Sequence, residues 1–548
     1  MPMRRSGMDS QPDLQQQLVA PLEQLLASGG DTRLALDPVS RLNGYGCRPF
    51  PRPDAFTFAS STATSISGRA YAAAAAARQS LLRESARIGF ERAFCAAMRA
   101  LRAELKSLLG LEASGCEIVF SPSGTDSQLH ATVLARAIIG APLTSIIAAA
   151  DETGGGTIFA TRCCHFNAVT AQGIAVVKGD KLAGIDEEIE CLAIAARTER
   201  GVPRPVADMD AEISDRVACA LATKKRVVLF AMDSSKFGLR APSSEALRRL
   251  AARSGEGLQI VIDACQTRLG RKRLRSYLDQ GFMVLLTGSK FFTGAPFSGA
   301  LLIPRALAAR YAAIARVPAG LREYTNRDDW PEAFAGLRAA LPTHANLGMW
   351  LRWVSAAEEM RDYFAVPLSF RELALRQFAE TVPQLMAAES CVEALPVADP
   401  VREEADDQEL GLRTIFPFFV MRNGRALPQA QAATLYHALN DDMSPFLPAM
   451  LPPMQRLLAA RRCHIGQPVA LPDGQGGLRG ALRISAGARI VSESWGPDLT
   501  RARDRLRGEF DQVRAILEKI RLLMRHFDDI EPAYAQFRAA APRRSSAA

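Results

Sequence analysis

The sequence is poor in the features that mark several classes of protein. Its 548 residues include ten cysteines, none of them in a C-x-x-C pair, which argues against a zinc ribbon and a thioredoxin-type site. Ten cysteines in a chain of this length are also too few for a disulfide framework. The first residues hold no apolar core of the kind that a secretory signal needs. We therefore expect a reducing, cytoplasmic location.

Long apolar runs and a dominant charge of one sign are missing as well. One of the longest uncharged stretches, residues 137–150, is shorter than the about 20 residues that a membrane-spanning helix needs. The chain has 67 Lys and Arg against 58 Asp and Glu, a net charge of +9, which is a thin excess for a nucleic-acid-binding protein. The densest basic run, Arg268 to Arg275, has no interleaved aromatics and indicates a solvated helix face. We expect neither a membrane nor a nucleic acid as a partner.

What the sequence does contain is the composition of a globular protein, with 48% hydrophobic and 23% charged residues. Short runs that are apolar throughout, rather than at every second residue, alternate with segments able to form helices. This alternation predicts an α/β fold with a mostly parallel sheet covered by helices on both faces. The predicted strands are residues 117–120, 145–149, 173–177, 226–230, 258–263, 281–287 and 299–303, and the predicted helices include 90–109, 125–138, 207–223 and 243–253.

The remaining sequence indicates a second, smaller unit. Residues 413–421 and 480–485 are expected to be strands, and residues 499–525 a charged helix. We therefore expect a large α/β domain followed by a smaller α+β C-terminal domain. The expected bounds are a disordered or loosely ordered segment 1–35, the large domain 36–350, the small domain 351–530 with an exposed connection at 396–409, and a flexible tail 531–548.

Polar residues follow three of the predicted strands, where ligands bind in sheets of this kind. The first group, Ser123, Gly124 and Thr125, lies between a strand and a helix. Hydroxyls, a glycine that lets the backbone come close, and free N–H groups at a helix N-terminus suit a phosphate. A simple helix cap made by Ser123 or Thr125 explains the same residues equally well.

The other two groups carry charge. Asp263 ends a buried strand, with Gln266 three residues later, and a buried carboxylate needs a cation or several hydrogen-bond donors. Lys290 follows the next strand among small and aromatic residues. Burial lowers the pKa of a lysine and makes its amine a nucleophile towards an aldehyde.

The segments Asp263-Ala-Cys-Gln266 and Thr287-Gly-Ser-Lys290 resemble those of fold type I enzymes that depend on pyridoxal 5'-phosphate (PLP). The resemblance is greatest to the class-V aminotransferase and cysteine desulfurase branch, and it runs from about Pro38 to Arg525, with the specific matches in these central segments. It implies a fold type I transferase architecture, PLP as the cofactor and a homodimer.

Residue by residue, the resemblance implies that Lys290 forms the internal aldimine with PLP. Asp263 would pair with the pyridinium nitrogen, which makes the ring an electron sink, and Gln266 would bond to its phenolic oxygen. His165 would stack on the ring and help to move protons, although a core or loop histidine is an open alternative. The phosphate would be held by Ser123, Gly124, Thr125, Thr287 and Ser289.

Two further segments match the substrate side of the family's site. Arg483, in Leu482-Arg-Ile-Ser485, would grip the substrate carboxylate, a task that suits a guanidinium. An ordinary surface strand residue is the alternative. The polar loop 56–67 stands where family members line the substrate channel.

The sequence also departs from the desulfurase pattern. Residues 234–238 read Ser-Ser-Lys-Phe-Gly where desulfurases carry Asn-Asn-Glu-x-Gly. A desulfurase also needs an activated cysteine in a mobile C-terminal loop. Cys463 is the one candidate near that place, and its apolar neighbours favour a buried structural thiol. Cys163 and Cys164 are expected to pack rather than to bind a metal, and we expect no metal site.

These observations predict a PLP-dependent enzyme acting at the α-carbon of an amino-acid-like substrate. Transamination is the preferred reaction, with Lys290 taking the α-proton and returning it to the cofactor. Decarboxylation is the nearest alternative, and desulfurase or lyase chemistry follows. A non-catalytic scaffold that keeps the fold is the alternative from another class.

Overall fold

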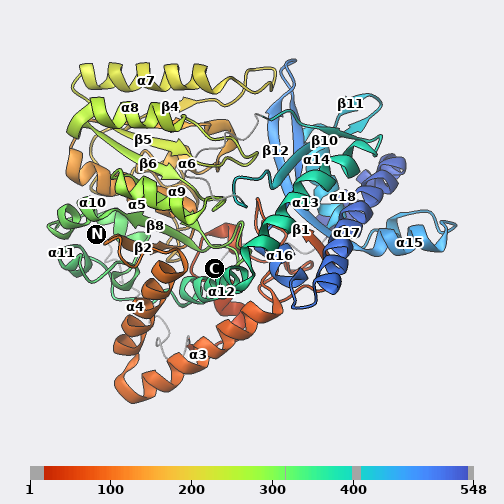
Figure 1. Cartoon of the computed structure of the whole chain (residues 1–548), viewed down its shortest axis with the longest axis horizontal. Helices are drawn as coiled ribbons and strands as arrows, with labels where there is room; N and C mark the ends of the chain where they lie inside the picture. Colours follow the sequence, from red (N-terminus) through yellow and green to blue (C-terminus); the bar gives the residue numbers. More distant parts are fainter. Residues whose placement is uncertain (1–17, 315, 398–408, 541–548) are drawn as a thin grey trace, which may run out of the picture.

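A computed structural model describes residues 18–314, 316–397 and 409–540. Two β-sheets lie side by side, and helices pack against each of them (Figure 1). Helix α3 (Gly68–Ile88) extends away from both sheets at the bottom of the view. The expected α/β fold is confirmed.

The larger sheet has seven strands in the order β2-β8-β7-β6-β5-β3-β4. The pairs along β7-β6-β5-β3-β4 are parallel, whereas β8 runs antiparallel to both of its neighbours. Strand β2 therefore runs in the same direction as these five, and the carboxyl ends of six strands meet at one edge. The strands are β2 (Glu117–Ser121), β3 (Leu143–Ala148), β4 (Glu190–Ile194), β5 (Arg226–Met232), β6 (Leu258–Asp263), β7 (Met283–Thr287) and β8 (Gly299–Ile303).

Apolar side chains on both faces explain why these strands lack an alternating pattern. Successive residues of a strand point to opposite faces, and here each face has its own apolar layer. Val261 packs with one layer and Ile262 with the other. The helices that belong to this unit are α4 (Phe90–Leu108), α5 (Gly124–Ile139), α6 (Thr157–Ala160), α7 (Val206–Ala222), α8 (Ser244–Ser254), α9 (Arg271–Asp279), α10 (Arg305–Ala312) and α11 (Ala335–Ala339).

The second sheet joins two distant parts of the chain. Its order is β1-β12-β13-β10-β11, with β9 paired to β10, and β1 is parallel to β12. Strand β1 comes from within the expected large domain, so the chain crosses to the smaller unit early. The strands are β1 (Ala55–Phe58), β9 (Val392–Ala394), β10 (Ile415–Arg422), β11 (Arg425–Ala426), β12 (Arg462–Pro472) and β13 (Leu478–Ser485).

Helices join and cover the two units. Helix α12 (Leu347–Ala365) contacts α3 and α4 as well as α16 (Ala488–Ser494). The long charged helix α17 (Leu499–Arg525) lies where the sequence predicts it. The other helices of this part are α13 (Leu368–Ala387), α14 (Gln429–Leu439), α15 (Pro453–Ala460) and α18 (Phe527–Ala540).

One predicted strand is wrong. Residues 173–177 form no strand, and β4, which the apolar runs did not predict, stands at the sheet edge instead. Ile174 and Val177 are 41% and 65% exposed, so this run is not part of the core. Strand β4 escaped notice because its pattern is mixed, with an exposed Glu190 and a buried Ile194. A short apolar run alone does not distinguish a core strand from a surface loop.

The chain ends also differ from expectation. Within segment 1–35, expected to be disordered or loosely ordered, residues 22–26 form helix α2 (Leu22–Leu26), and Leu22, Leu25 and Leu26 are buried. Residues 531–540 continue helix α18 instead of starting a tail. Residues 1–17, 541–548 and most of the expected connection 396–409 lie outside the described residues.

Membrane insertion has no candidate helix in the part of the chain that the structure describes. None of the helices in that part combines the length and the hydropathy that a span requires.

Gly299 tests how tightly strand β8 packs against the start of helix α5. A Cβ on Gly299 would lie 2.4 Å from the carbonyl oxygen of Ser123. We expect Gly299→Ala to lower the free energy of unfolding by about 1–3 kcal/mol, because the contact is with backbone that cannot rotate away. Denaturant unfolding measures the change. Gly508→Ala is the matched control: its Cβ meets nothing within 4 Å in helix α17, so it should stabilise by roughly 0.5–1 kcal/mol. Equal stability of Gly299→Ala and the parent would contradict the packing.

Candidate active site

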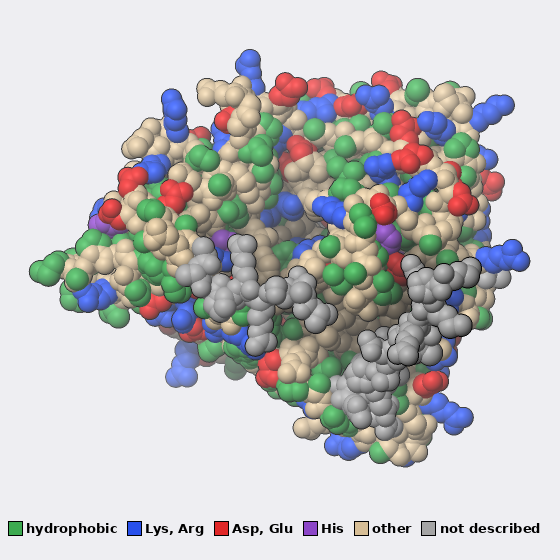
Figure 2. Space-filling model, turned by 180° about the vertical axis from the view of Figure 1, so that it is seen from behind, with side chains coloured by type: hydrophobic (Ala, Val, Ile, Leu, Met, Phe, Trp, Pro, Cys, Tyr) green, Lys and Arg blue, Asp and Glu red, His purple; other side chains and the backbone are tan. Residues whose placement is uncertain are grey.

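A cavity of about 440 Å3 opens at the edge where the parallel strands of the larger sheet end. The face in Figure 2 is hollowed near its centre, and Lys and Arg side chains are visible there. Segments that follow β2, β3, β5, β6 and β7 line the cavity, together with parts of the second sheet. The structure brings together nine of the predicted site residues in its wall: Ser123, Gly124, Thr125, Asp263, Gln266, Thr287, Ser289, Lys290 and Arg483.

Lys290 lies in the turn after β7. Its Nζ donates a hydrogen bond to the carbonyl oxygen of Thr62, in the loop that the sequence assigns to the substrate channel. Burial, followed by the charges of Arg483 and Lys236, lowers the pKa of Lys290 to about 7. Much of this amine is therefore neutral near neutral pH, which is the state in which it attacks a carbonyl or accepts a proton.

Asp263 lies at the end of β6 in the same wall and is 5% exposed. Its Oδ2 accepts a hydrogen bond from Nε2 of Gln128 (2.9 Å), and its Oδ1 accepts one from the backbone N–H of Cys265 (3.1 Å). Burial raises the pKa of this carboxyl, while the hydrogen bonds and the charge of Lys290 oppose the rise. A carboxylate has about four acceptor positions, so Asp263 keeps capacity for a further donor.

The N-terminus of helix α5 forms one end of the cavity. Ser123 is its N-cap: Oγ accepts from the N–H of Asp126 at 3.3 Å. Gly124 allows a close approach, because a Cβ there would lie 2.6 Å from Sγ of Cys265. The cap that the sequence allows as an alternative is therefore present, and it leaves other N–H groups of the first turn free for an anion.

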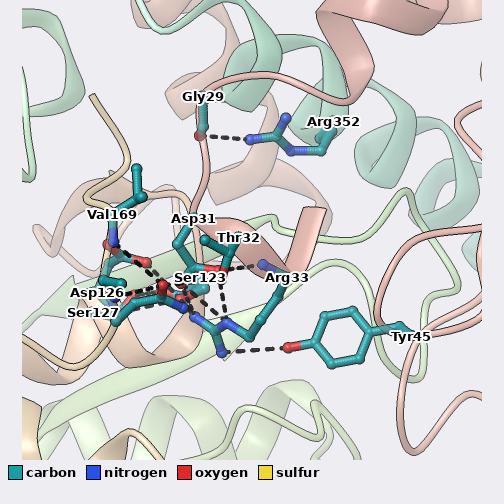
Figure 3. Close-up of polar contacts among 12 residues, drawn as sticks. Gly29, Asp31, Thr32, Arg33, Tyr45, Ser123, Asp126, Ser127, Val169 and Arg352 are labelled. Atoms are coloured by element: carbon teal, nitrogen blue, oxygen red, sulfur yellow. Dashed lines mark hydrogen bonds and ion pairs between the residues drawn. The ribbon is translucent and has the colours of Figure 1, made fainter. Parts of the chain in front are cut away.

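An arginine from the N-terminal segment reaches this end of the cavity (Figure 3). Arg33 pairs with Asp31 at 2.6 Å and donates to Oγ of Ser123 at 3.2 Å and to the hydroxyl of Tyr45 at 3.3 Å. Arg352 holds the start of this segment by donating to the carbonyl oxygen of Gly29 at 3.0 Å. The cavity thus gains a fixed guanidinium beside the helix N-terminus.

Two of the predicted ligands are bonded to protein atoms. Gln266 donates from Nε2 to the carbonyl oxygen of Ser61 (3.0 Å), and its Oε1 accepts from Arg268 (2.6 Å). The hydroxyl of Thr287 donates to the carbonyl oxygen of Cys265 (2.6 Å). Both side chains line the cavity, but these bonds limit what they offer a ligand.

Arg483 lies on β13 and brings the second sheet to the site. It is 2% exposed, so the alternative of a surface strand residue is wrong. Its guanidinium donates to Oγ1 of Thr62 (3.0 Å) and to the carbonyl oxygen of Gln467 (2.7 Å), while its Nε has no partner among the described residues. Burial lowers the pKa of Arg483 to about 10. It is a buried cation that no carboxylate of the described chain neutralises.

His165 is the predicted residue that the structure does not bring to the cavity. Its Nδ1 lies 2.8 Å from the hydroxyl of Tyr324, its ring stacks on that tyrosine at 5.8 Å, and its Nε2 lies 3.9 Å from Glu323. The neighbours Phe166 and Asn167 line the cavity, but His165 does not. The expected role in ring stacking is not supported, because the histidine turns away towards Tyr324.

Sequence reasoning missed several lining residues. Arg33 and Tyr45 come from stretches without a motif, and Gln128 is a helix residue one turn after the phosphate segment. Residues 152–157, after β3, carry Gly154-Gly-Gly156 and line the cavity where His165 was expected. That glycine run was the available signal. Lys236 lies in segment 234–238, whose departure from the desulfurase pattern did not by itself predict that this lysine lines the cavity.

The cysteines show no sign of an activated thiol. Cys463 is 1% exposed on β12, outside the cavity lining, and burial raises its pKa to about 11. Cys163 is buried as well, with a pKa of about 12. Among the described residues, no group of three or more His, Cys, Asp or Glu is arranged to hold a metal ion.

Known proteins resemble the chain in fold only. No family model matches it, and no curated protein does. Similar solved structures include the cystine C-S lyase C-DES with cysteine persulfide (14% identity, 84% of this chain, 98% of that chain, TM-score 0.49). The cysteine desulfurase CsdA from Escherichia coli (13%, 84% and 94%, 0.45) and Oryza sativa TDC with PLP and tryptamine (14%, 85% and 83%, 0.45) are others. At this level of similarity, a proposal about function has to rest on the geometry of the chain's own cavity.

The charge of Lys236 is expected to contribute, after burial and Arg483, to the lowered pKa of Lys290. Replacing it in Lys236→Met removes a neighbouring cation, so the pKa of Lys290 should rise above about 7. A Coulomb change of roughly 1–2 kcal/mol would lower the neutral fraction of Lys290 at pH 7, and with it the rate of acetylation, about 3- to 15-fold. Competitive labelling with acetic anhydride, followed by mass spectrometry, measures the rate.

Lys272, exposed on helix α9, is the internal reference and should be labelled equally in both proteins. An unchanged labelling profile of Lys290 would show that the two amines do not interact.

Proposed function

We propose that the chain is a PLP-dependent enzyme that acts at the α-carbon of an amino-acid-like substrate. One observation carries the proposal: a single cavity holds a half-buried lysine with a pKa of about 7 and a buried carboxylate, with a helix N-terminus in the same wall. An aldehyde, a basic ring nitrogen and a phosphate are the three groups that these features suit.

The donors and acceptors fit that cofactor. Free N–H groups at the start of α5, the hydroxyls of Thr125 and Ser289 and the guanidinium of Arg33 suit a phosphate. Asp263 would accept from the protonated ring nitrogen and, in its buried setting, keep it protonated. Lys290 would hold the aldehyde carbon. When bound, PLP supplies an electron sink for charge that develops at the substrate α-carbon.

We propose transamination as the reaction, with Arg483 and Lys290 as the protein groups that act on the substrate. Arg483 is available for the substrate carboxylate, since no protein carboxylate pairs with it within the described chain. Lys290 is set to take a proton at the α-carbon and to return it, because its amine is half neutral at about pH 7. With His165 turned towards Tyr324, Lys290 takes the proton-transfer role alone.

Decarboxylation uses the same residues with a different orientation of the carboxylate, and it stays the nearest alternative. A desulfurase mechanism is disfavoured, since Cys463 is buried outside the cavity. The homodimer, the cytoplasmic location and the domain bounds remain predictions from the sequence. If the protein takes up no PLP, the alternative of a scaffold without turnover is favoured.

Lys290→Ala tests the attachment of the cofactor. The protein with added PLP should be yellow, and borohydride should abolish the visible band and fix the label on Lys290. The variant should show neither the band nor the label, because no other lysine of the described cavity replaces its position. Absorbance spectroscopy and peptide mass spectrometry measure both. Lys178→Ala, which removes an exposed lysine at the same cavity, should keep the band. A band that survives in Lys290→Ala would refute the assignment.

Asp263→Asn tests the ring partner. An amide does not supply the negative charge that keeps the ring nitrogen protonated, so exchange of substrate α-protons should slow by about 10²- to 10³-fold while the visible band remains. Proton exchange of amino acids in deuterated water, followed by NMR, gives the rate. In the same samples, a 2-oxo acid indicates transamination and carbon dioxide indicates decarboxylation. Full exchange activity in Asp263→Asn would exclude this role for the carboxylate.

A further inference from the structure

Three cations line one part of the cavity, and no carboxylate among the described residues pairs with them. Lys290, Lys236 and Arg483 all line it, and the charges of Lys236 and Arg483 both lower the pKa of Lys290. The carbonyl oxygen of Lys236 lies 3.5 Å from Nη1 of Arg483, which places the two residues next to each other. Within the described ranges, none of the three forms an ion pair with Asp or Glu.

The carboxylates of this region are already engaged. Glu152 pairs with Arg197 at 2.7 Å, with both side chains only 2% exposed, and it also accepts a hydrogen bond from Ser235. Its charge favours protonated Lys236, but burial and Arg483 outweigh it. Asp263 accepts from Gln128 and from the backbone of Cys265. Glu152 is neutralised by Arg197, and under the proposed function the charge of Asp263 is used by the ring nitrogen, so neither carboxylate is left for Lys236.

Arg483 is buried and the two lysines are half-buried. Three cations shielded from water without a carboxylate partner among the described residues are unfavourable, so this arrangement calls for an anionic ligand. Lys236 has one hydrogen bond from its ammonium, to the carbonyl oxygen of Thr153 at 2.6 Å, whereas an ammonium has three donors. Helix α5 and Arg33 already serve the phosphate end of the cavity. Lys236, which follows β5, is therefore assigned to the substrate side.

Counting the charges then points to the substrate. Under the proposed function, on which this inference rests, Lys290 is used by the cofactor and Arg483 by the α-carboxylate. Lys236 is left over. We propose that the substrate is an amino acid whose side chain carries a second anionic group, a carboxylate, sulfonate or phosphate, and that Lys236 binds this group.

Spectral titration of the PLP-loaded protein tests the proposal. L-Aspartate and L-glutamate should bind about 10- to 100-fold more tightly than L-asparagine and L-glutamine, the range for one charge-assisted hydrogen bond. L-Cysteate and O-phospho-L-serine distinguish a sulfonate or phosphate from a carboxylate. In Lys236→Met, the acidic and neutral members of each pair should bind within about threefold of each other, as expected when that bond is lost.

Lys178→Met is the matched control, since Lys178 lines the same cavity but is exposed, and it should keep the preference. Equal binding of acidic and neutral amino acids by the parent protein, or a preference that survives in Lys236→Met, would overturn the proposal and leave Lys236 as a tie to the Thr153 loop only.

A second measurement separates this inference from the cofactor assignment. In protein without PLP, succinate should raise the thermal midpoint more than butyrate does, and Lys236→Met should remove the difference. A protein that never takes up PLP but distinguishes the two acids would refute the proposed function and retain the anion site. A protein that takes up PLP but responds equally to both acids would retain the proposed function and refute the anion site.

Discussion

The chemistry of the cavity depends on three cations, Lys290, Lys236 and Arg483, which are shielded from water and have no carboxylate partner in the part of the chain that the structure describes. About half of the Lys290 amine is neutral near pH 7, because burial and two neighbouring cations disfavour its protonated form. The same unfavourable environment makes the site receptive to anions. Reactivity and binding therefore have a common physical origin, and the chain does not need a separate base to prepare the lysine.

The fold supplies this environment by bringing two sheets to one edge. Parallel strands of the larger sheet present Asp263 and Lys290 side by side, and β13 of the second sheet contributes Arg483. Strand β1 crosses early into the second sheet, so the loop that follows it, with Thr62, closes the cavity over Lys290. Residues that are far apart in the sequence, from Arg33 to Arg483, therefore line one cavity.

Much of this could be predicted from the sequence, because buried parallel strands have a continuous apolar pattern and their polar ends are easy to locate. Asp263, Lys290 and the Ser123–Thr125 turn follow from that rule alone. The failures have equally clear causes. Residues 173–177 are apolar but exposed, and the position of His165 depends on its contact with Tyr324, a partner far along the chain. The sequence shows that Lys236 departs from the desulfurase pattern, but its role as an anion ligand can be proposed only once the structure places it beside Arg483.

The anchoring of Arg33 has a practical consequence for anyone handling this protein. The sequence predicts that segment 1–35 is disordered or loosely ordered. In the structure, however, Arg352 donates a hydrogen bond to Gly29, and Arg33 lies beside Ser123. Deleting the first 35 residues to obtain a more uniform sample would remove Arg33, which lines the cavity. A preparation shortened in that way would be a poor guide to what the intact molecule binds.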